Sequence, residues 1–205
     1  QMKDTTMFTE GLANITKAVE MDSTNAAVMS EIGQALFKGK KYEAAAKAYE
    51  ISIKNPERAL LDYYYLGSSY YFNYGALKNA NLNPEKDLLV KADSSFAYLL
   101  QRAPTTQIAW QYRGRINRLL DDENDSQGLA VPFYAKYIEL VTVEKPELAA
   151  KSSPGLIEAY NYLGSVAARK DGDNVKAKEY FDKVLALDPA NVTATQAVKA
   201  IDGSK

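Results

Sequence analysis

A glycine recurs at matched places along this chain of 205 residues, each time inside a similar pattern of aromatic, aliphatic and small residues. Gly33 and Gly67 lie 34 residues apart, and Gly114 and Gly164 occupy the corresponding places further on. A fixed period of about 20–50 residues is typical of arrays in which each structural repeat packs only on its neighbours. The spacing therefore predicts an array of helical pairs rather than one globular core.

Large side chains keep a constant distance from these glycines. Tyr49 precedes Gly67 by 18 residues, and Phe96 precedes Gly114 by the same interval. A small residue comes four positions before the large one, as Ala45 does before Tyr49, so both lie on one face of a helix. A glycine inside a helix costs about 1 kcal/mol relative to alanine. We therefore expect the glycines to allow a close approach of the neighbouring helix.

This pattern resembles the tetratricopeptide repeat family over nearly the whole chain. The best matches are Tyr160-x-x-Leu163-Gly164 and Tyr63-x-x-Leu66-Gly67-x-x-Tyr70, and prolines close the units at Pro56, Pro104, Pro146 and Pro189. The resemblance implies an all-α fold, a right-handed α-solenoid of about ten helices in a single domain over residues 1–205. The segment 128–140 is further similar to repeat proteins of Gram-negative bacteria, which favours a periplasmic or envelope location, with a cytoplasmic one as the alternative.

The repeat register divides the chain into a partial unit, 1–25, four full units, 26–58, 59–105, 106–152 and 153–189, and a capping helix, 190–202. Because the opening helix, centred on Ile15, Ala18 and Val19, fits the second half of a unit, we expect a longer array with the carboxy-terminal part represented here. The expected helices are 6–22, 26–38, 42–54, 58–73, 86–102, 106–120, 129–143, 154–169, 174–187 and 191–202.

Two units are longer than the standard length. Gly67 to Gly114 is 47 residues and Gly114 to Gly164 is 50, against 34 for the first interval. The first insert is expected between paired helices at 72–85, where asparagines and Pro84 supply turn chemistry. The second is expected to divide between 121–128 and 143–154, with Ser153 capping the helix that Pro154 opens.

Composition narrows the function. The chain has no Cys and no His, which removes thiol nucleophiles, Ser-His triads and zinc sites, and its net charge of −1 does not favour nucleic-acid binding. No apolar run approaches the roughly 20 residues of a membrane span. We expect no cofactor and no metal, and we interpret the acidic loop 121–125 as a solvated charge run rather than a calcium site. Glu158 is the isolated acid on its face, so a hydrolase with paired carboxylates is not expected.

In the tetratricopeptide family the first helix of each pair lines a concave groove. The resemblance thus implies a partner-binding groove formed by Ser30, Gln34, Phe37, Tyr64, Ser68, Tyr71, Gln111, Arg115, Arg118, Asn161 and Ser165. Ordinary solvated or inter-helix residues are the alternative for each. Arg113 replaces an aliphatic residue of the other units, and we interpret it as a stem packed on the core with its head on an acidic neighbour.

The leading functional hypothesis is a non-enzymatic scaffold that binds an extended peptide or partner protein of unknown identity in this groove. Gln and Asn would satisfy the peptide backbone, and Arg would meet a carboxylate. The alternative is a bacterial envelope protein that captures a glycan or other small ligand through the groove aromatics, with Tyr64, Tyr71 and Trp110 as the stacking residues.

Overall fold

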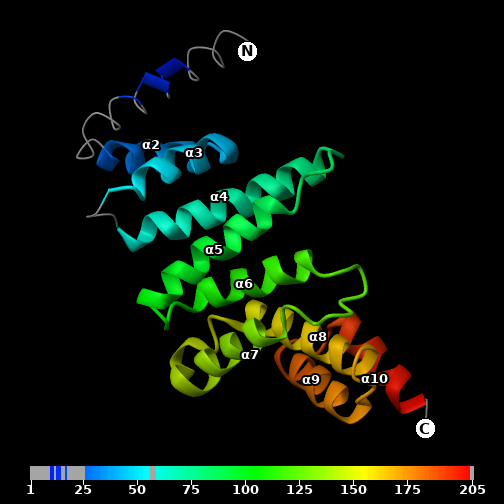
Figure 1. Ribbon diagram of the computed structural model, residues 1–205. Helices are drawn as coiled ribbons and strands as arrows, with labels where there is room; N and C mark the ends of the chain where they lie inside the picture. Colours follow the sequence, from blue (N-terminus) through cyan, green and yellow to red (C-terminus); the bar gives the residue numbers. More distant parts are fainter. Residues whose placement is uncertain (1–9, 12, 15–16, 18–25, 56–58, 204–205) are drawn as a thin grey trace. The chain divides into compact units, whose positions relative to one another are not determined.

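The computed structural model describes residues 10–11, 13–14, 17, 26–55 and 59–203, and in these ranges the chain is helical with no strand (Figure 1). The chain divides into two compact units, Gln1–Arg102 and Ala103–Lys205. The opening helix expected at 6–22, with Ile15, Ala18 and Val19, falls largely outside the described residues, as does Pro56. A single solenoid domain over the full length stays a prediction.

Over residues 26–55 and 59–102 the first unit forms two helical hairpins. The helices of these ranges are α2 (Ala26–Lys38), α3 (Tyr42–Ser52), α4 (Leu60–Asn79) and α5 (Asp87–Arg102). Each packs on the next in sequence, and α2 also contacts α4. The turn after α2 is a Schellman motif, because Lys40 has a φ of 57° while the Lys41 N–H donates to the carbonyl of Leu36. Asn81, with a φ of 56°, ends α4 in the same way.

The second unit has two hairpins and a final helix. Its helices are α6 (Gln107–Leu120), α7 (Val131–Glu139), α8 (Ser153–Arg169), α9 (Asn174–Leu187) and α10 (Val192–Gly203). A π-helical turn, Leu140–Glu144, extends α7, and a 3₁₀ turn, Pro146–Leu148, precedes α8. Sequential helices pack together, and α6 also contacts α8. Asp173 caps α9 by accepting from the Lys176 N–H at 2.9 Å.

The expected close approach at the repeated glycines is confirmed. A Cβ added to Gly67 would lie 2.8 Å from Cε2 of Phe96, and one added to Gly114 would lie 2.6 Å from Cε1 of Tyr134. Gly33 and Gly164 meet the rings of their own hairpins in the same manner. Each glycine thus lets the ring of the second helix sit against the backbone of the first.

The structure corrects two expectations about the inserts, the end of the helix expected at 58–73 and the capping role of Ser153. The helix expected to end at residue 73 continues to Asn79, because Tyr74 is buried at 6% exposure and extends the packed face. The turn that follows occupies only 80–86. Ser153 is the first residue of α8 and not its cap, since its hydroxyl donates to the Ala150 carbonyl at 3.0 Å.

No helix in the described ranges is both long and apolar enough to cross a bilayer.

Candidate functional site

The second unit places a half-buried ion pair between α6 and α8. Arg115 donates to both carboxylate oxygens of Glu158, with Nη2 to Oε2 at 2.6 Å and Nε to Oε1 at 2.8 Å. Gln111 donates to the same carboxylate at 3.1 Å, and the Tyr134 hydroxyl donates at 2.7 Å from α7. Glu158 is therefore paired with a cation and two neutral donors, which the sequence interpretation did not foresee. This network ties three helices together and occupies Arg115 and Gln111 internally.

The electrostatics of this pair follow from its surroundings. Burial alone would raise the pKa of Glu158, but the hydrogen bonds from Arg115 and Tyr134 outweigh it and hold that pKa below its ordinary value. Burial, together with the neighbouring Glu158 charge, raises the pKa of Tyr134. Glu158 is thus an ionised carboxylate surrounded by donors, which does not suit it to act as a general acid.

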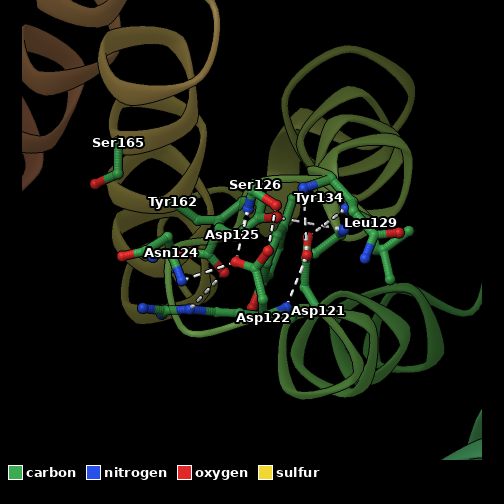
Figure 2. A network of polar contacts seen from close by, with 12 residues as sticks. Asp121, Asp122, Asn124, Asp125, Ser126, Leu129, Tyr134, Tyr162 and Ser165 are labelled. Atoms are coloured by element: carbon green, nitrogen blue, oxygen red, sulfur yellow. Dashed lines mark hydrogen bonds and ion pairs between the residues drawn. The ribbon is translucent and has the colours of Figure 1, made fainter.

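A second polar cluster forms the loop between α6 and α7 (Figure 2). Asp121 is 4% exposed, and its carboxylate accepts the backbone N–H groups of Asp122, Gln127 and Leu129 at 2.8–3.2 Å. Burial raises its pKa, but these donors more than offset that effect, so the pKa lies below the ordinary value. The interpretation of this loop as a solvated charge run is wrong for Asp121, because its carboxylate is the centre that organises the backbone.

Asp125 is also buried, at 5% exposure, and links the loop to α8. It accepts from Arg169 Nη2 at 3.0 Å, and Nε of Arg118 lies 3.8 Å from its other oxygen. The second distance is too long for a hydrogen bond. Because 53% of the Arg118 side chain is exposed, its guanidinium remains accessible to another acceptor.

Three of the predicted groove residues meet at one open polar pocket of about 280 Å³. Arg118 enters it from α6, and Asn161 and Ser165 enter from α8. Thr193 from α10, Tyr162 and Glu158 complete its lining. The Oδ1 atom of Asn161 is buried and has no hydrogen-bond partner in the described part of the chain. The pocket therefore offers a cation and hydroxyl groups within one concave space.

These helical pairs can be compared with known structures. No protein-family model matches the sequence, and no curated protein does. The chain is similar to a crystal structure of the C-terminal part of a TPR repeat-containing protein from Cytophaga hutchinsonii, with 31% sequence identity and a TM-score of 0.70. The similarity covers 91% of this chain. The chain has the tetratricopeptide repeat fold of that protein. It spans 65% of that neighbour's length.

In the first unit of this repeat protein the predicted groove residues are more enclosed than expected. Ser68 is fully buried on α4, so it does not line an open surface, which corrects its assignment. Ser30 donates to Asp62 Oδ1 at 2.6 Å, and Ser52 from α3 donates to Oδ2 at 2.5 Å. Ser30 therefore helps to satisfy a buried carboxylate that joins α2, α3 and α4. Gln34 accepts from Lys38 at 3.3 Å on the exposed side of α2.

The predicted aromatic residues of this unit pack against other rings. Phe37 makes edge contacts with Tyr65 and Phe72, and Tyr71 contacts Phe72 with ring centroids 5.4 Å apart. Tyr64 makes edge contacts with Tyr65 and Phe96. Such contacts stabilise the repeat interface and leave the aromatic residues only partly exposed.

Trp110 and Arg113 of the second unit also contact other residues of the chain. Trp110, named for glycan stacking, donates its Nε1–H to the Pro104 carbonyl at 2.8 Å and packs against the apolar core. The Arg113 guanidinium lies 4.2 Å from the ring centroid of Phe133. Its charged head thus sits over an aromatic face, a contact that the sequence interpretation did not include.

Three residues that contact the site of the second unit were not predicted from the sequence: Tyr134, Asp125 and Thr193. Tyr134 was not assigned to Gly114, although Ala130 lies four residues before it and repeats the small-then-large spacing found elsewhere. That spacing could have identified the pair. Asp125 and Thr193 carry no comparable signal, because loop closure and the placement of α10 bring them to the site.

Proposed function

We propose that this protein is a non-enzymatic scaffold that holds an extended segment of a partner protein against the first helices of its repeats. The tetratricopeptide fold supports a protein-interaction role in general. The observation that carries the specific proposal is the polar pocket, where Arg118, Asn161 and Ser165 converge with Thr193. A guanidinium beside hydroxyl groups suits the acceptors and donors of a peptide.

Arg115 and Arg118, two of the three arginines of α6, have different roles in this scaffold. Arg115 is a structural residue, because its guanidinium already binds Glu158 at 2.6–3.0 Å. Arg118 is the contact residue, because more than half of its side chain is exposed and Asp125 lies 3.8 Å away. Removing Arg115 would leave a half-buried carboxylate without its cation, so only Arg118 can test binding without disturbing the fold.

Site-specific photocrosslinking tests this proposal in the full chain. A benzophenone side chain at Thr193, in the pocket, is expected to capture a partner from an extract, and the added change Arg118→Gln should reduce that capture. The same group at Val175, which is 75% exposed on α9 and lies outside the pocket lining, serves as the matched control. Equal capture at both positions would contradict binding at this face.

The envelope location stays a proposal that rests on the segment 128–140. Binding of a glycan through Tyr64, Tyr71 and Trp110 likewise stays a prediction. The ring contacts and the Trp110 hydrogen bond make these side chains less suited to stacking on a sugar.

A further inference from the structure

A second, apolar pocket adjoins the polar pocket of the second unit. It has a volume of about 330 Å³, and most of its lining residues are apolar: Ala168, Phe181, Ala197, Ala200 and Ile201. Asn174 and Arg169 also line it, and the Arg169 guanidinium already donates to Asp125 at 3.0 Å. Ser165 lines both pockets, so they meet at this residue. The two pockets together form a groove, called here the α8–α10 groove.

The two pockets follow one another along both helices. On α8 the polar pocket takes Asn161 and the apolar pocket takes Ala168, with Ser165 between them. On α10 the polar pocket takes Thr193, and the apolar pocket takes residues from Ala197 onward. Polar and apolar ends therefore have the same order on the two walls, which aligns an extended ligand along α8 and α10.

The polar end has the charge and hydrogen-bonding groups to bind an acidic peptide residue. Arg118 offers N–H groups that Asp125, at 3.8 Å, does not engage as a hydrogen-bond acceptor. The carboxylate of Glu158 does not leave this end negative, because Arg115, Gln111 and Tyr134 donate to it. Ser165 and Thr193 offer hydroxyl groups to the backbone of the ligand, whereas Oδ1 of Asn161 is itself buried.

The distance between the two ends sets the spacing in the ligand. Asn161 and Ala168 are seven residues apart on one helix, which corresponds to about 10 Å at roughly 1.5 Å per residue. A polyproline II segment rises about 3.1 Å per residue and returns to the same face every three residues. An acidic side chain and an aliphatic side chain three positions later would therefore face the two pockets together.

We propose that the α8–α10 groove binds an extended peptide segment with an acidic side chain in the polar pocket and an aliphatic side chain, three residues further on, in the apolar pocket. This inference rests on the proposed scaffold function and specifies its ligand. The carboxylate proposed for the polar pocket is that of a side chain, and a free terminal carboxylate is the competing ligand in the test below.

Defined peptides test this specificity. The probe is a fluorescein-labelled, carboxy-amidated peptide with a central Glu-Ser-Thr-Leu sequence between Gly-Ser flanks, titrated with the full chain by fluorescence anisotropy. Replacing Glu by Gln is expected to weaken binding about tenfold, through loss of a charge-assisted hydrogen bond. Replacing Leu by Ala should weaken it about tenfold as well, through loss of buried apolar surface.

Variants of the protein assign each preference to one pocket. Arg118→Gln should remove the preference for Glu over Gln and retain that for Leu over Ala, whereas Arg118→Lys should keep part of the Glu preference. Ala200→Phe, an exposed change in the lining of the apolar pocket, should remove the Leu preference alone. Arg102→Gln, on α5 of the first unit, is the matched control and should alter neither. Circular dichroism confirms that each variant is folded.

The outcomes separate this inference from the proposed function. Equal affinity for the Glu and Gln peptides, or an unchanged Glu preference in Arg118→Gln, would overturn the inference. Binding that requires a free terminal carboxylate would overturn it as well. If no peptide binds but the Thr193 crosslinker captures a partner, the inference fails and the scaffold function stands. If neither occurs, both are wrong.

Discussion

The extra residues of the two long repeats form different structures. In the first unit the additional residues lengthen α4 to Asn79, and only 80–86 form a turn. In the second, α6 ends at Leu120 and a loop follows, organised by the buried carboxylates of Asp121 and Asp125. The same kind of length increase therefore produced a longer helix in one place and a structured loop in the other.

Local chemistry explains the difference. Beyond residue 71, α4 continues with Phe72 and Tyr74, which pack on neighbouring side chains, and no acidic residue interrupts the run. After α6 the residues 121–125 contain three aspartates and one glutamate. Acidic side chains oppose the dipole at a helix carboxyl end, and aspartate competes for backbone N–H groups in turns. Continued apolar packing extends a helix, whereas clustered acids end it.

The contacts between the repeated glycines and the aromatic rings, which both units share, should have the largest effect on the free energy of unfolding. Gly67→Leu in the first unit and Gly114→Leu in the second are each expected to destabilise by about 3 kcal/mol, since the new side chain would overlap the Phe96 or Tyr134 ring. Gly75→Ala on α4 is the matched control, because an added Cβ there meets nothing within 4 Å and should stabilise slightly. Thermal unfolding measures both, and an unchanged melting temperature for either leucine variant would contradict the ring packing.

The loop of the second unit should be nearly as sensitive. Asp121→Ala removes an acceptor for three backbone N–H groups in a buried position and is expected to cost about 2–3 kcal/mol. Glu123→Ala, two residues on and exposed, should change stability by less than about 0.5 kcal/mol. Urea unfolding compares the pair. Similar small effects would mean that the loop is a solvated charge run after all.

The smallest expected effect is a pH dependence confined to this loop. Because the folded-state pKa of Asp121 lies below its ordinary value, its ionised form stabilises the protein above about pH 4, the pKa range of an unfolded aspartate. That contribution is lost as the pH falls through the folded-state pKa. Asp121→Asn should therefore cost about 1–2 kcal/mol at pH 7. Urea titrations should show the gap to wild type closing in acid, and a gap independent of pH would contradict the ionised cap.

Three residues of the polar pocket could be predicted from the sequence because the repeats are regularly spaced. Arg118, Asn161 and Ser165 were predicted from helical register, and they line one pocket because each lies on a first helix at the matching face. Ser68 followed the same register but is buried, since the aromatic side chains around α4 close over that face. Register fixes where a residue lies on its helix and leaves open how deeply its neighbours cover it.

The sequence by itself determined the helical repeats, because glycine, the small residue and the ring recur at fixed intervals and each hairpin packs locally. Only the tertiary structure decided which charged side chains form ion pairs with one another. Glu158 lies 43 residues from Arg115, and Asp125 lies 44 from Arg169. Such pairs depend on how separate helices and a loop meet in space, and no periodic pattern in the chain records that meeting.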